Sequence, residues 1–90
     1  MIPTGFYRHF KGNYYYVLGT AIHSETLVEM VVYRALYGEE KLWVRPAEMW
    51  NERVERESYQ GPRFIPVGSE EVPEEIRRRA VMLQESVLGK

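Results

Sequence analysis

The residues in this sequence that most clearly suggest chemistry are four arginines placed inside aromatic or aliphatic segments: Arg8, Arg34, Arg45 and Arg63. A guanidinium in such a setting needs an acceptor, because burying its charge without a partner is very costly. Two interpretations follow. The arginines and exposed aromatic rings can form a groove that holds a phosphate, a carboxylate or a stacked base. Alternatively, the arginines can pair inside the protein with Glu29, Glu48 or Glu52.

The first interpretation predicts a binding module rather than an enzyme. The sequence contains no recognisable nucleophile motif, metal-ligand spacing or phosphate-binding loop, so we assign no catalytic residue, metal ligand or cofactor. We expect the ligand on a single arginine and aromatic face, with six candidate residues: Arg8, His9, Tyr33, Arg34, Trp43 and Arg45. The partner class stays open between a nucleotide or similar anionic ligand, single-stranded nucleic acid and an acidic protein segment.

The two histidines support a rival interpretation, a small enzyme acting on a nucleotide-like anion with His9 or His23 as acid or base. The run from His23 to Glu25 does not predict a hydrolase, because adjacent residues of an extended segment point to opposite faces and no Gly-x-Ser-x-Gly turn surrounds Ser24. Both histidines together with Glu25 and Glu29 are the plausible metal set, but their spacing matches no ligand motif. The alternative is two ordinary strand-end histidines, each with one ring nitrogen hydrogen-bonded.

Length and composition limit the possibilities further. A chain of 90 residues predicts one domain. It has no cysteine, so disulfides and cysteine-ligated zinc are excluded. A net charge of -1 provides no overall attraction to nucleic acid or to an anionic membrane. Because no apolar run approaches the roughly 18 residues of a membrane span, and residues 1–5 lack the layout of a signal peptide, we expect a soluble, cytoplasmic protein.

The elements that must position these residues are mostly strands. Aromatic and β-branched segments separated by turns predict strands over residues 6–10, 14–22, 27–36, 42–45 and 61–67. Residues 27–36 also have helical spacing, but three consecutive strand formers, Val31, Val32 and Tyr33, favour a strand. Residues 46–50 predict one helical turn that carries Met49 and Trp50 onto the core, and residues 53–60 an exposed, charged loop.

Two small residues in the second strand, Gly19 and Ala21, predict a strongly curled sheet, because their spacing places them on the same face as Val17. The fold prediction is therefore mainly β: a small, strongly bent antiparallel sheet or SH3-like barrel of about five strands, with one C-terminal α-helix. Residues 1–67 form the predicted barrel domain.

The last quarter of the chain, residues 68–90, predicts this helix. Pro73 suits the first helical position, and Glu74 and Glu75 favour the positive end of the helix dipole. An apolar stripe follows at helical spacing: Ile76, Ala80, Leu83 and Val87. We expect this stripe to pack on the barrel or on a second copy, so a third interpretation is an interaction protein that dimerises through it.

Five blocks in order, YRHFKG, HSET, VVYRALYG, LWVRP and PRF, resemble a small bacterial family, domain of unknown function 1653. The resemblance covers residues 7–64 and leaves the tail from residue 67 to 90 outside. It implies a compact β domain that bacteria keep as a separate chain. It implies no reaction, and it transfers no catalytic residue to this sequence.

Overall fold

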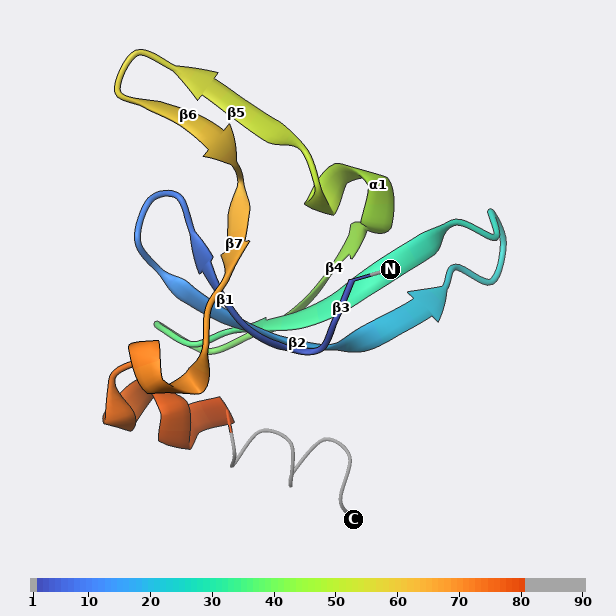
Figure 1. The fold of residues 1–90 in the computed structure, drawn as a ribbon. Coiled ribbons are helices and arrows are strands. Elements are labelled where there is room, and N and C mark those ends of the chain that lie inside the picture. Colours follow the sequence, from blue (N-terminus) through green and yellow to red (C-terminus); the bar gives the residue numbers. More distant parts are fainter. Residues whose placement is uncertain (1, 81–90) are drawn as a thin grey trace.

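The computed structural model describes residues 2–80, which form a mainly β domain, as predicted (Figure 1). A five-stranded antiparallel sheet has the order β4-β3-β2-β1-β7. Its strands are β1 (Gly5–His9), β2 (Tyr14–Ile22), β3 (Glu29–Ala35), β4 (Leu42–Pro46) and β7 (Phe64–Pro66). The remaining elements are α1 (Ala47–Trp50), the separate hairpin of β5 (Arg53–Arg56) and β6 (Tyr59–Pro62), the 3-10 turn η1 (Ser69–Glu71), and a helix over residues 74–80.

The strand β2 contains a β-bulge that corrects one prediction. Val17 lies opposite Tyr33, but the next pair joins Gly19 to Val32, so Leu18 is an extra residue in β2. One extra residue reverses the alternation of faces beyond it. Gly19 therefore lies on the face opposite Val17, not on the same face. A bulge of this kind increases the local twist and bends the strand. The sheet is therefore curled as predicted, but the cause is the bulge rather than small residues on the face of Val17.

The sheet does not close, and the prediction of a barrel is wrong in this respect. β4 and β7 are its two edges, and they do not pair with each other. β7 has three residues and ends at Pro66, and β4 ends at Pro46. Proline cannot donate a ladder hydrogen bond, so neither edge offers a long regular ladder for closure.

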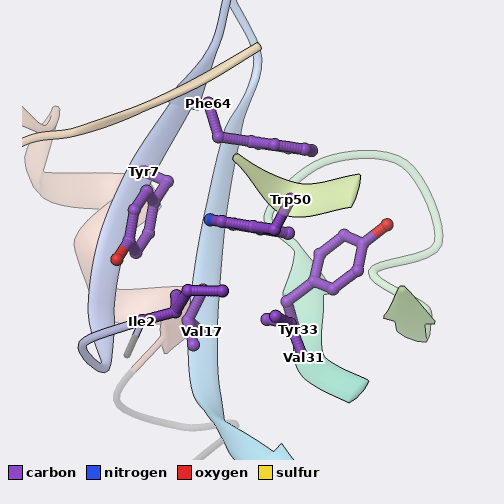
Figure 2. Close-up of a cluster of buried hydrophobic side chains, with 7 residues drawn as sticks. All are labelled: Ile2, Tyr7, Val17, Val31, Tyr33, Trp50 and Phe64. Carbon is purple, nitrogen blue, oxygen red and sulfur yellow. The ribbon is translucent and has the colours of Figure 1, made fainter. Parts of the chain in front are cut away.

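Aromatic side chains fill the space that the curled sheet leaves open (Figure 2). The main core cluster consists of Ile2, Tyr7, Val17, Val31, Tyr33, Trp50 and Phe64. The rings of Trp50 and Phe64 stack with centroids 3.8 Å apart and an interplanar angle of 1°. Tyr7 and Tyr33 meet the indole edge-on from either side, at 5.4 and 4.8 Å. The predicted helical turn is confirmed as α1, which buries Trp50 but leaves Met49 39% exposed.

The predicted loop over residues 53–60 is instead part of a hairpin, β5 with β6, that stands away from the main sheet (Figure 1). Its charged side chains are exposed, while Val54 and its partner Gly61 are buried. One apolar residue flanked by charged residues gives no alternation of apolar and polar side chains from which a strand could be predicted. The predicted strand over residues 61–67 is divided at Arg63, whose backbone N–H donates to Glu52 O at 3.0 Å.

The helix over residues 74–80 contacts the face of the sheet opposite the Trp50 core. Ala80 packs with Leu36, and Ile76 joins Phe6, Tyr14 and Tyr16 around them. The Arg79 guanidinium donates to Leu36 O at 3.0 Å and lies 3.5 Å from a Glu40 carboxylate oxygen. Leu83 and Val87 of the predicted stripe lie outside the described residues. None of the helices in the described part of the chain has the length and apolar character needed to cross a membrane.

Candidate ligand-binding site

The six predicted ligand residues divide between the two faces of the sheet. Residues directly opposite each other in an antiparallel pair share a face, and successive residues alternate. Tyr33 lies opposite Trp43, and Val31 opposite Arg45, so both β4 side chains share the face of the Trp50 core, here called the inner face. His9 also lies on this face, because it is two residues along β1 from the core residue Tyr7. The structure thus places His9, Tyr33, Trp43 and Arg45 on one face of the sheet.

The other two candidates, Arg8 and Arg34, lie on the outer face and do not join this group. Arg8 is opposite Tyr14, whose ring packs against the Leu36 and Ala80 cluster on that face. The Arg34 guanidinium donates to Glu40 O at 3.0 Å and so supports the turn between β3 and β4. Arg34 therefore has a structural contact of the kind that the internal-pairing interpretation requires, although its acceptor is a carbonyl rather than a carboxylate. Its Nε is buried without a hydrogen-bond partner in the described residues.

A group of positive charges surrounds His9 on the inner face. Burial lowers the pKa of His9, and the charges of four neighbours lower it further: Arg63, Lys11, Arg45 and Arg56. These five residues are called the cationic cluster below. The pKa shift keeps the imidazole neutral near pH 7, so the positive field of the cluster comes from the lysine and the arginines. Such a field attracts an anion.

Arg45 occupies the position in the cluster where an acceptor is most needed. Its side chain is half-buried, and its guanidinium lies 5.8 Å from the centre of the Phe64 ring. Its Nε is buried and donates no hydrogen bond within residues 2–80, and Arg45 forms no ion pair there. Nearly all buried donors in native proteins have an acceptor, and this Nε has none among the described residues, a property it shares with the Nε atoms of Arg34 and Arg63.

Tyrosine hydroxyls border Arg45. The hydroxyls of Tyr15 and Tyr37 are hydrogen-bonded to each other at 2.8 Å. Burial and this hydrogen bond raise the pKa of Tyr15, whereas the nearby charge of Arg45 opposes the rise. Burial likewise raises the pKa of Tyr33, again against the effect of Arg45. Both phenols therefore stay neutral at physiological pH. The Tyr33 hydroxyl lies close enough to Arg45 to accept a hydrogen bond from its guanidinium, and its O–H can donate to a further acceptor.

Arg63 belongs to the cluster although it was absent from the six candidates. Its side chain lies 3.8 Å from a Glu52 carboxylate oxygen, so internal pairing holds for this arginine. Its Nε is nevertheless buried without a hydrogen-bond partner in the described residues. The same sequence signal, an arginine inside an apolar segment, identified Arg63 and could have placed it in the candidate set.

The β5–β6 hairpin contributes a further cation that the sequence did not predict. Arg56 lies with its guanidinium 5.2 Å from the centre of the Phe10 ring, and Lys11 contacts the same ring at 5.9 Å. Tyr59 of the hairpin stacks on Phe10 at 5.3 Å. The sequence predicted an exposed loop over residues 53–60. It therefore gave no reason to expect that Arg56 contacts Phe10.

The histidines have structural roles at the ends of strands. His9 Nδ1 accepts the backbone N–H of Lys11 at 3.2 Å, and His23 Nδ1 accepts those of Glu25 and Thr26, both at 3.2 Å. These bonds stabilise turns at opposite ends of β2, whose nine residues span about 30 Å. The two histidines therefore cannot share a metal ion. No group of three or more potential metal ligands occurs within residues 2–80.

Comparisons with known proteins agree with this fold. The model of the family DUF1653, described as a protein of unknown function, matches residues 5–66. The crystal structure of a DUF1653 protein from Bordetella bronchiseptica is 39% identical in sequence and superimposes with a TM-score of 0.69. The match covers 74% of this chain and 88% of the other. A comparison with curated proteins found no match.

Proposed function

This chain belongs to the DUF1653 family of proteins of unknown function, and we propose that it is a binding module that recognises an anionic group at the cationic cluster. The observation that carries the proposal is the group of cations near His9, in which Arg45 has neither an ion pair nor an acceptor for its buried Nε within residues 2–80. A buried donor without an acceptor costs about 1–3 kcal/mol. A carboxylate or phosphate that reached the half-buried Arg45 guanidinium would form a charge-assisted hydrogen bond with it.

The charge balance of the cluster supports the same conclusion. Lys11, Arg45, Arg56 and Arg63 lie close enough to lower the pKa of His9. Among residues 2–80, the ion pair that these four cations form is that of Arg63 with Glu52. The surplus of positive charge favours an anion. The neutral Tyr33 hydroxyl beside Arg45 can donate a second hydrogen bond to it. The site needs no chemical step for this role, which is binding alone.

A thermal-shift experiment tests the proposal, because a ligand that binds the folded state raises Tm. The probes are inorganic phosphate, acetate and a short oligonucleotide, each compared with chloride at equal ionic strength. At a ligand concentration of about 100 times Kd the stabilisation is about 2.7 kcal/mol, or a Tm rise of roughly 10–20 °C for a domain of this size.

Two matched arginine variants locate the site. Arg45→Met keeps the length and apolar contacts of the side chain but removes the guanidinium, so we expect it to abolish the Tm rise. Arg8→Met makes the same change on the outer face and should leave the rise intact. Equal loss in both variants, or no loss in Arg45→Met, would contradict the proposed site.

A further inference from the structure

The strand β4 is an edge of the sheet whose outward backbone groups are available for pairing. β4 pairs with β3 on one side and with no strand of the described chain on the other. The N–H of Ala35 donates to Lys41 O at 3.1 Å, so the backbones of residues 41, 43 and 45 face β3. Because alternate residues face opposite sides, the N–H and C=O groups of Leu42 and Val44 point away from the sheet.

This edge is also apolar and exposed. Leu42, Trp43 and Val44 are 46%, 51% and 58% exposed. Natural proteins protect such edges with charges, prolines or bulges, because an exposed apolar edge invites another strand. Within β4 the proline and the charge come at the C-terminal end, at Pro46 and Arg45. Three consecutive apolar residues before them remain open.

Two recognition features lie beside the edge on the inner face. The first is a shallow hollow of about 130 Å³ where the turn between β3 and β4 meets Trp43, lined by Ala35, Tyr37, Gly38, Glu39, Glu40, Lys41 and Trp43. This volume equals that of about four liquid water molecules and suits one apolar side chain. The second is the Arg45 guanidinium; Arg45 follows Trp43 by two residues on the same strand face, a rise of about 6.6 Å along the backbone.

We propose that β4 binds an extended acidic segment of a partner protein as a sixth strand of the sheet. The segment forms backbone hydrogen bonds with Leu42 and Val44, places a carboxylate on Arg45, and directs an apolar side chain to Trp43 and the hollow. The inference rests on the proposed function, because it identifies the anionic group as an Asp or Glu side chain. Since Trp43 and Arg45 are two residues apart, the acidic and the apolar residue of the partner must also be two apart.

Two other occupants fit the edge less well. A second copy that paired through its own Leu42–Pro46 segment would bring no carboxylate to Arg45. A nucleic acid strand has no peptide backbone with which to extend the ladder, and its phosphates would meet Glu39 and Glu40 at the hollow. An acidic peptide satisfies both the backbone groups and the guanidinium.

Selection from a phage-displayed library of random linear peptides, with the full chain as bait, tests the spacing. We expect enrichment of an acidic residue and an apolar or aromatic residue with one residue between them. Enrichment of acidic residues without this spacing, or no enrichment at all, overturns the inference. A soluble peptide of the enriched sequence and its Glu→Gln counterpart then serve as probes, and the Gln peptide should bind roughly tenfold more weakly or worse.

Two substitutions at Val44 test the backbone pairing. Val44→Pro removes an N–H that points away from the sheet, so the β3–β4 ladder and the circular dichroism spectrum should be unchanged. Val44→Thr keeps the N–H and the β-branched shape. We expect the peptide to bind Val44→Thr as it binds the wild type, and Val44→Pro about tenfold more weakly or worse.

Several outcomes separate this inference from the proposed function. If Arg45→Met abolishes the Tm rise with phosphate or acetate while Val44→Pro binds the peptide normally, the anion site stands and the added strand is wrong. If no anion or peptide binds, both fail. If sedimentation shows that the wild type self-associates and Val44→Pro is monomeric, a second copy occupies the edge and the partner peptide is excluded.

Discussion

Replacing Trp50 with alanine tests whether aromatic packing holds the open sheet together. Trp50 is 2% exposed and contacts three core rings, those of Phe64, Tyr7 and Tyr33. Burial of an aromatic side chain removes about 150–250 Å² from water, worth roughly 4–6 kcal/mol at about 25 cal/mol per Å². Measured Trp→Ala costs of about 3–5 kcal/mol agree with this range. We therefore expect Trp50→Ala to lower the free energy of unfolding by about 4 kcal/mol.

Urea unfolding, followed by circular dichroism, measures this change through the transition midpoint. Met49→Ala is the matched control, because Met49 precedes Trp50 on α1 but is 39% exposed; it should cost about 0.5 kcal/mol or less. Trp50→Phe should fall between the two, since it keeps one ring and removes the buried indole N–H that has no acceptor within the described residues. A loss below about 1.5 kcal/mol for Trp50→Ala would refute the reasoning and show that the sheet is stable without this side chain.

Two further predictions concern pH and a turn. Because the pKa of His9 is lowered from 6.5 in the folded state, the unfolded chain binds the proton first as the pH falls; stability should be fully present above about pH 6.5 and decline below it. His9→Gln should flatten this decline in Tm measured across that range, and an equally steep decline would contradict the assignment. Gly38 has φ +60 with open space around its missing Cβ, so Gly38→Ala should cost about 1 kcal/mol in urea unfolding from backbone strain. Gly38→Asn should cost less, and equal stability of all three proteins would count against this explanation.

Local chemistry in the sequence predicted most of the elements. The turn at residues 11–13 needs a positive φ, which Gly12 adopts at 112°. Pro46 ends β4 where the missing N–H predicts an end. The compact turn after it buries Trp50 as expected. Each of these features depends on residues next to each other in the chain, which is why the sequence alone was sufficient.

The candidate site was predicted less well, because it depends on the register between strands. Within one strand, alternation already separates Arg8 from His9. Whether Arg34 or Tyr33 shares a face with Trp43 depends on how β3 pairs with β4, and a shift of one residue would exchange them. That register is set by the turn over residues 36–41, which Arg34 and Arg79 hold through contacts with Glu40 and Leu36. One of those contacts comes from the C-terminal helix, so no local pattern could reveal it.

The open sheet connects stability with the proposed binding edge. If β4 and β7 had paired to close a barrel, backbone hydrogen bonds would have occupied both edges. Side chains instead cover the inner face of the open sheet, since Trp50 from α1 stacks on Phe64 from β7. Side chains exclude water from the core without using the N–H and C=O groups of Leu42 and Val44. Among the described residues, a core sealed in this way leaves the β4 edge beside Arg45 unpaired, and an added peptide strand requires such an edge.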